Sequence, residues 1–164
     1  VNNAGVSQPL KLMDITDDDY NLVMDVSMRG SYNMARSVVP HFRKQQSGAI
    51  VCIGSVAGLR GGGILGGPHY AAAKGAIHSF AKALARELGP DGIRCNAIAP
   101  GLVLTNLLTG RMDDDARKRI SDQVPLGRNG TARDIANACL FLTSDLSSFV
   151  TGTILDVNGG FHIH

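Results

Sequence analysis

The sequence has few aromatic residues and no block of like charges. Tryptophan is absent, aromatic residues make up 5% of the 164 residues, and the formal net charge is only +2. A nucleic-acid surface usually combines basic side chains that follow the phosphates with aromatic rings that stack on bases. The composition therefore argues against a nucleic-acid partner.

Long apolar runs and an export signal are also lacking. No run approaches the roughly 18–20 apolar residues that cross a membrane, and the first residues, VNNAGVSQPL, have neither a basic nor an apolar leader region. The cysteines Cys52, Cys95 and Cys139 are odd in number and stand in apolar contexts, which predicts reduced thiols. We therefore expect no membrane association and a cytoplasmic location.

The histidines do not form a metal-binding pattern. His162 and His164 have H-x-H spacing, but no carboxylate or cysteine accompanies them, so we expect solvated side chains and no metal site. His69 precedes a predicted helix. A surface position is the favoured interpretation of His69, with a substrate contact at the mouth of a pocket as the alternative.

What the sequence does contain is an alternation of helical and strand patterns over one domain, residues 1–164. The predicted helices cover 16–44, with a possible break near Gly30, then 68–88, an irregular stretch at 104–123, and 131–143. The predicted strands are 49–55, 93–99 and 152–157. This order predicts an α/β fold with a doubly wound, mostly parallel sheet, whose ligands bind beyond the carboxyl ends of the strands.

One helical pair suggests chemistry. Tyr70 and Lys74 stand four positions apart in GGPHYAAAKGAIHSF, so their side chains share one helix face at about 5–6 Å between Cβ atoms. A nearby ammonium group favours the phenolate form of a tyrosine. The pair is a candidate for general acid–base catalysis, although an isolated Y-x-x-x-K more often marks a packed tyrosine beside a solvated lysine.

Five motifs in order resemble the second half of a short-chain dehydrogenase/reductase. They are NNAG at 2–5, IGSVAG at 53–58, YAAAK at 70–74, IRCNAIAPGLVLT at 93–105 and DVNGG at 156–160. The resemblance covers essentially the whole chain and implies a Rossmann-like fold of which only the C-terminal half is present. The family's first half, with the Gly-rich turn that binds the cofactor pyrophosphate, has no counterpart in these residues.

The resemblance implies catalytic roles for three side chains. Tyr70 would transfer a proton to or from the substrate oxygen while hydride passes to or from a nicotinamide. Lys74 would stabilise the phenolate and hydrogen-bond the nicotinamide ribose. Ser55 would hold the substrate oxygen near the phenol. The implied reaction interconverts a secondary alcohol and a ketone with NAD or NADP.

The resemblance also implies contacts with the cofactor. Pro100 and Gly101 would form a tight turn beside the nicotinamide, with the Val103 backbone and the Thr105 hydroxyl on its carboxamide. In the NNAG turn, the residues expected beside the adenosine ribose are Asn3, Ala4 and Gly5.

One residue departs from the family pattern. Ser27 stands where the family commonly has an asparagine whose backbone carbonyl holds a water linked to the lysine. A serine can keep that link while losing the bonds of the asparagine side chain.

The absent first half leaves a second interpretation open, in which the chain is an inactive half-domain that serves as an oligomerisation or binding module.

Substrate and assembly are less determined by the sequence. Residues 104–123 fall where the family has its mobile substrate lid, and their leucines favour an apolar substrate such as a 3-oxoacyl thioester, a steroid or a cyclic ketone over a sugar. An epimerase or dehydratase on the same fold is the enzymatic alternative. The family resemblance implies a homotetramer built on helices at about 26–45 and 68–88, with Met34, Val38 and Phe42 in the contact and a dimer as the alternative.

Overall fold

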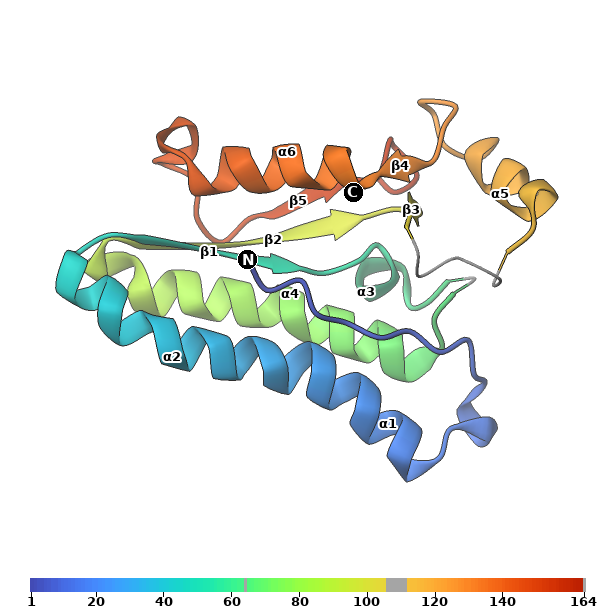
Figure 1. Ribbon diagram of the computed structural model, residues 1–164, viewed down its shortest axis with the longest axis horizontal. Helices are drawn as coiled ribbons and strands as arrows, with labels where there is room; N and C mark the ends of the chain where they lie inside the picture. Colours follow the sequence, from blue (N-terminus) through green and yellow to red (C-terminus); the bar gives the residue numbers. More distant parts are fainter. Residues whose placement is uncertain (64, 106–111, 164) are drawn as a thin grey trace.

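The fold is an α/β arrangement in three layers, seen in a computed structural model that describes residues 1–63, 65–105 and 112–163 (Figure 1). The central layer is a three-stranded parallel sheet in the order β1-β2-β5. Its strands are β1 (Gly48–Ile53), β2 (Ile93–Pro100) and β5 (Ile154–Val157). A second pairing joins the two-residue strands β3 (Val103–Leu104) and β4 (Gly130–Thr131). The predicted parallel α/β fold is confirmed.

Helices cover both faces of the sheet. In Figure 1, α2 and α4 lie below it and α6 lies above it. The α-helices are α1 (Asp17–Met24), α2 (Gly30–Gln45), α3 (Ala57–Arg60), α4 (Pro68–Leu88), α5 (Asp114–Ser121) and α6 (Ala132–Thr143). Short 3-10 turns occupy Leu12–Asp14, Gly89–Asp91 and Asp145–Ser147.

The predicted helix 16–44 contains a π-helical turn. Residues Asp25–Arg29 join α1 to α2 in π geometry, so the two helices are continuous along the chain but not in one α-helical register. A π turn accommodates one extra residue and is frequent at functional sites. Here the turn carries Ser27, which is fully buried.

Alternate strand residues face opposite helical layers, as the pleat of a strand requires. On one face Ile50, Cys52 and Cys95 join the core under α2 and α4, and on the other Val51 and Ile98 pack with Leu142 of α6. Burial on both faces explains why the strands are apolar throughout. No described helix is both long enough and apolar enough to cross a membrane.

The N-terminal residues run beside the carboxyl half of β1. Asn2 forms a parallel bridge with Cys52, with hydrogen bonds from Asn2 N to Val51 O (2.7 Å) and from Ile53 N to Asn2 O (2.9 Å). The NNAG turn is therefore carried to the end of the sheet where β1 stops.

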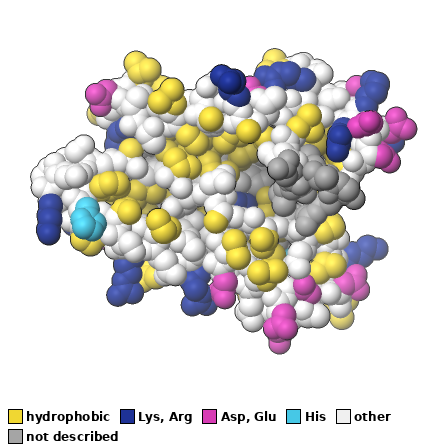
Figure 2. Space-filling model, in the orientation of Figure 1, with side chains coloured by type: hydrophobic (Ala, Val, Ile, Leu, Met, Phe, Trp, Pro, Cys, Tyr) yellow, Lys and Arg dark blue, Asp and Glu magenta, His cyan; other side chains and the backbone are white. Residues whose placement is uncertain are grey.

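Figure 2, in the orientation of Figure 1, shows hydrophobic side chains gathered along the middle of the molecule, between the layer of α6 and that of α2.

Several predicted boundaries were wrong, among them the end of the strand expected at 49–55, which stops at Ile53. Among the described residues of the helical stretch expected at 104–123, only α5 is a helix: Leu104 belongs to β3, and Asp113 caps α5 by accepting a bond from Ala116 N. Leu107 and Leu108, part of the expected lid, lie outside the described residues. Strand β5 begins at Ile154 and not at 152, since Gly152 has a φ of 75°, which does not belong to a strand.

Candidate active site

Ser55, Tyr70 and Lys74 meet at the carboxyl end of β1. Ser55 follows β1 by two residues, and its hydroxyl accepts a hydrogen bond from Ala57 N at 3.1 Å, which fixes the turn into α3. Tyr70 and Lys74 lie on the first two turns of α4. The Ser55 side chain lies close enough to the Tyr70 phenol to lower its pKa. The structure thus places the two hydroxyls near each other.

The surroundings of Tyr70 favour its protonated form. Burial raises the pKa of the Tyr70 phenol above its usual value, and the Ser55 side chain lowers it by less. Lys74 Nζ lies 5.8 Å from the centre of the Tyr70 ring. Burial is therefore the largest influence on the pKa of Tyr70 in this state, and the stabilisation of the phenolate by Lys74 stays a prediction. In this state Tyr70 is a proton donor, the form needed to protonate a ketone oxygen.

Lys74 is held by the backbone of β1. Its side chain is only 4% exposed, and Nζ donates a hydrogen bond to Ile53 O at 2.8 Å. Burial lowers the pKa of the Lys74 ammonium to about 8, with a small opposing effect from Cys52. The amine is thus anchored near the end of the strand and remains mostly protonated at neutral pH.

Gly5 and Ser27 lie beside this amine. A Cβ on Gly5 would stand 3.2 Å from Lys74 Nζ and 3.8 Å from Ser27 Oγ. Gly5 is exposed, as are Asn3 and Ala4, so the NNAG turn offers open backbone next to the lysine. The lack of a side chain at Gly5 leaves room for a ligand against the amine.

Ser27 has an unusual hydrogen-bond state. Its backbone carbonyl, which was expected to hold a water, accepts bonds from Ser31 Oγ at 2.7 Å and from the Gly30 N–H, so two donors from the helix already reach this oxygen. The Ser27 hydroxyl is buried and has no hydrogen-bond partner among the described residues. A buried hydroxyl left in this way is costly unless a water or ligand reaches it.

The Pro100–Thr105 segment lies at the same edge of the sheet. Pro100 ends β2, and its carbonyl accepts a bond from Val56 N at 3.0 Å, which ties this turn to the residue after Ser55. Gly101 is closely packed, since a Cβ there would lie 3.1 Å from Asn158 Cβ. Val103 enters β3, while Thr105 is exposed. These positions border the site, as their place after a strand predicted.

His69 is buried, so the prediction of a surface histidine was wrong. It is 3% exposed, and its Nε2 lies 3.1 Å from Gln8 Oε1. The sequence held a signal for this burial, because His69 shares a four-residue spacing with Ala73, Ile77 and Ala81, all buried on α4.

His78 is a second residue that sequence reasoning missed. It is 4% exposed, and its Nε2 lies 3.4 Å from Ser55 N. A Cβ on Gly54 would collide with its ring, so the glycine at this position lets the imidazole pack beneath the turn that carries Ser55.

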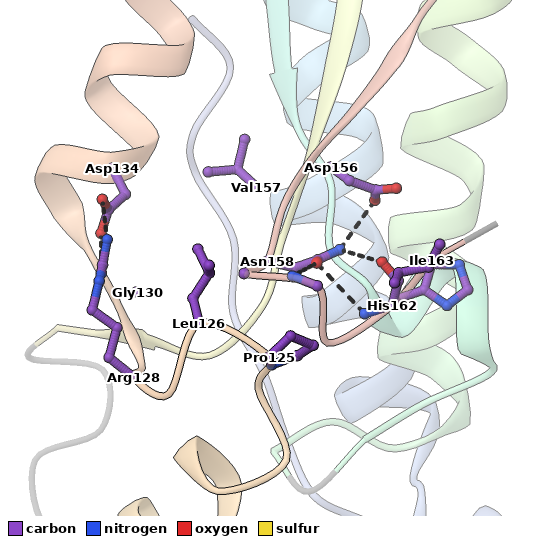
Figure 3. A pocket seen from close by; sticks show the side chains of 12 residues that line it. Pro125, Leu126, Arg128, Gly130, Asp134, Asp156, Val157, Asn158, His162 and Ile163 are labelled. Carbon is purple, nitrogen blue, oxygen red and sulfur yellow. Dashed lines mark hydrogen bonds and ion pairs between the residues drawn. The ribbon is translucent and has the colours of Figure 1, made fainter.

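A cavity of about 800 Å³ opens on another side of the strand ends (Figure 3). Leu126, Pro125 and the Arg128–Asp134 ion pair border it, with Asn158 hydrogen-bonded to Asp156 and to His162 O. None of the three catalytic candidates lines it. His162 contributes to this wall, whereas His164 lies outside the described residues. The described residues hold no group of His, Cys, Asp and Glu suited to a metal ion.

The fold and this site together define a short-chain dehydrogenase/reductase. A family model described as "Enoyl-(Acyl carrier protein) reductase" matches residues 1–162, and the chain belongs to the short-chain dehydrogenase/reductase family.

Similar proteins extend beyond the length of this chain. An uncharacterized short-chain type dehydrogenase/reductase of Sinorhizobium fredii is 48% identical over 164 residues, all of this chain and 65% of that protein. The 3-oxoacyl-[acyl-carrier-protein] reductase FabG of Escherichia coli is 40% identical over 99% of this chain and 66% of its own length. The chain thus spans about two thirds of these relatives.

Solved structures with bound dinucleotide resemble this chain closely. A 3-oxoacyl-[acyl-carrier protein] reductase of Brucella melitensis with bound NAD has a TM-score of 0.91 at 37% identity, over 99% of this chain and 61% of that one. A gluconate 5-dehydrogenase of Burkholderia cenocepacia in complex with NADP and tartrate also has a TM-score of 0.91, at 32% identity, over 98% of this chain and 62% of that one.

Close packing of α3 on α4 supports the site and yields a prediction. A Cβ at Gly58 would lie 2.6 Å from Gly75 N and from the carbonyl carbon of Lys74. We expect Gly58→Ala to lower the free energy of unfolding by about 1–3 kcal/mol, the usual cost of overpacking, in denaturant titrations. The control is Gly63→Ala, where a Cβ would meet nothing within 4 Å among the described residues. Equal stability of the two variants would contradict the packing argument.

Proposed function

We propose that the whole polypeptide, meaning residues 1–164 with any chain that precedes or follows them in the encoded protein, is an NAD(P)-dependent oxidoreductase that interconverts a secondary alcohol and a ketone. The observation that carries the proposal is the meeting of Ser55, Tyr70 and Lys74 at one strand end. The bound dinucleotides of the structural relatives support the cofactor class.

The residues present fit a dinucleotide at its nicotinamide end. The open backbone at Gly5 leaves space beside Lys74 Nζ, and the unpartnered Ser27 hydroxyl lies next to that space. Asn3, Ala4 and Gly5 would lie beside the adenosine ribose, and Pro100, Gly101, Val103 and Thr105 beside the nicotinamide. When bound, the cofactor supplies or accepts the hydride.

Each catalytic side chain has a separate task in this proposal. Ser55 orients the substrate oxygen toward the phenol, and protonated Tyr70 gives its proton to that oxygen as a ketone is reduced. Lys74, protonated and fixed on Ile53 O, lies near enough to stabilise the phenolate that remains. In the direction of alcohol oxidation, the proton returns to Tyr70.

The proposed substrate is an apolar ketone, with 3-oxoacyl thioesters ranked first. The support is the naming of relatives at 40% and 43% identity as 3-oxoacyl-[acyl-carrier-protein] reductases. The structural likeness to a gluconate 5-dehydrogenase favours a second candidate class, the polyhydroxy acids. The test is to compare kcat/KM of the whole polypeptide for a 3-oxoacyl thioester and for a 5-keto acid of a sugar with NADPH and NADH. No oxidation of either cofactor by any ketone would overturn the proposal.

We also propose a cytoplasmic homotetramer. The free cysteines Cys52 and Cys95 support a reducing compartment. For assembly, Met34 is 55% exposed on α2 and available for contact. Val38 and Phe42 pack against the chain's own core, so the contact expected from all three is smaller than the sequence suggested. Sedimentation at micromolar concentration measures the state directly, and a monomer would contradict it.

A further inference from the structure

A chain of side-chain hydrogen bonds links the residue before Tyr70 to the start of α1. His69 Nε2 lies 3.1 Å from Gln8 Oε1, and Gln8 Nε2 donates to Asp19 Oδ1 at 2.6 Å. Nothing in the proposed reaction uses any of these three residues. They come from three segments: the loop after the NNAG turn, the first turn of α1, and the first turn of α4.

The direction of every bond in this chain follows from Asp19. Hydrogen bonds from the Thr16 side chain and backbone, and from Gln8, hold the pKa of the Asp19 carboxyl below its usual value, so it is ionised and can only accept. Gln8 must then turn its amide nitrogen toward Asp19 and its oxygen toward His69. His69 therefore donates from Nε2, which fixes the proton on that nitrogen.

Asp19 is itself immobilised by the N-terminal cap of α1. Its Oδ2 accepts from Thr16 Oγ1 at 2.6 Å and from Thr16 N at 3.2 Å, while Thr16 Oγ1 accepts from Asp19 N at 3.1 Å. This reciprocal capping box leaves Oδ1 free for Gln8. The bond chain thus ends on a rigid helix terminus and not on a mobile surface carboxylate.

Backbone contacts join the same segment to the loop that leads into α4. Gly67 N donates to Gln8 O at 2.8 Å, and Ser7 Oγ donates to Leu65 O. Gly67 also lies against the carbonyl of Leu10, where a Cβ would collide. Gly67 is the N-cap of α4 but supplies no side-chain cap, so the first turn, which holds Tyr70, depends on neighbours for its position.

We infer that the Asp19–Gln8–His69 hydrogen-bond chain is a positioning device, which sets the first turn of α4 so that the Tyr70 hydroxyl meets Ser55 and the substrate oxygen. The inference rests on the proposed function for its catalytic consequence. His69 acts through Tyr70 and does not touch the reacting atoms. A displacement of about 1 Å at a proton-transfer group can cost up to 10²-fold in rate. Loss of the Asp19–Gln8–His69 hydrogen bonds should therefore lower kcat.

Two substitutions at His69 separate the bond to Gln8 from the rest of the imidazole. In His69→Gln the amide nitrogen reaches about as far as Nε2 and can still donate to Gln8. In His69→Asn it reaches only as far as Nδ1, a nitrogen that is buried without a hydrogen-bond partner among the described residues. The variants share their chemistry and differ in reach.

We expect His69→Gln to keep kcat within a few-fold of the wild type, and His69→Asn to lose about 10- to 100-fold in kcat with unchanged dinucleotide affinity by calorimetry. Gln8→Leu, which removes the middle residue of the hydrogen-bond chain, should show the same loss of kcat as His69→Asn. Each is measured in the whole polypeptide, with thermal unfolding recorded alongside. Loss in both His69 variants in proportion to their unfolding temperatures would reduce the role to packing and overturn the inference.

Hydrogen exchange makes the result independent of activity. The Gly67 amide, bonded to Gln8 O, and the Ala71 amide, bonded to Gly67 O at 3.1 Å, report on the entry to α4. Both should exchange faster in His69→Asn and at the wild-type rate in His69→Gln. Activity retained by Asn and lost by Gln would assign the role to Nδ1 and overturn the inference. If wild-type protein reduces no ketone, the proposed function fails, but equal exchange in all variants is what refutes the positioning role.

Discussion

Replacing Tyr70 by phenylalanine is expected to abolish turnover while leaving dinucleotide binding largely intact. The substitution removes one hydroxyl from a half-buried ring, so packing on α4 is preserved, but the proton donor beside Ser55 is lost. A general acid–base group contributes about 10²–10⁴-fold, and kcat should fall by at least that factor. Steady-state kinetics with calorimetric cofactor titration in the whole polypeptide measure both quantities.

The matched control is Tyr20→Phe. The substitution removes the same hydroxyl from a tyrosine on α1 that is 48% exposed. The proposed mechanism does not use Tyr20. We expect wild-type rates from this variant. A Tyr70→Phe variant that turned over at the wild-type rate would remove Tyr70 from the chemistry and with it the proposed mechanism.

The second large effect is expected at Lys74. Lys74→Met keeps most of the side-chain volume but removes the donor to Ile53 O and the buried charge beside Tyr70. Both kcat and cofactor affinity should fall, the rate by at least about 10²-fold, since in the proposed mechanism the amine would serve both the phenol and the nicotinamide ribose. Lys82→Met, an exposed position on the same helix, should change neither. A variant that lost rate but kept full cofactor affinity would refute the ribose contact.

Lys74 also predicts how stability changes with pH. Its pKa is lowered by burial from 10.5 to about 8 in the folded chain. Between these values the unfolded chain binds more protons than the folded one, so the free energy of unfolding rises with pH across this window. The full gain is about 3 kcal/mol and is absent below pH 8. Denaturant titrations from pH 7.5 to 10.5 should show the rise in wild type relative to Lys74→Met, and parallel curves would contradict it.

Much of this architecture is readable from local signals. The helix starts predicted at residues 16 and 131 rest on the capping patterns of Thr16 with Asp19 and of Thr131 with Asp134, and both pairs form complete capping boxes. The Y-x-x-x-K spacing placed two side chains on one face of α4, and a β-branched apolar run identified β1. Such features are encoded within a few residues, so neighbouring sequence suffices.

What escaped prediction depends on contacts between distant segments. The short β3–β4 pairing exists because Gly130 N reaches Leu102 O at 2.8 Å, a contact that no local pattern signals. The raised pKa of Tyr70 depends on how deeply the assembled site buries it. For His69 the helical spacing indicated burial, but the polarity of a histidine favoured a surface position in our prediction. Its hydrogen-bond partner Gln8 lies 61 residues away in the sequence, so no local pattern indicated it.

The π-helical turn at Asp25–Arg29 also bears on which changes in chain length the protein can accept. Removing one residue there would let a regular α-helix run through, and each residue of an α-helix corresponds to a rotation of about 100° and a rise of about 1.5 Å. Helix α1 would then rotate about its own axis relative to α2, and this rotation would move Asp19 away from Gln8. Insertions and deletions at this turn should be far less tolerated than side-chain substitutions on its exposed surface, such as Arg29.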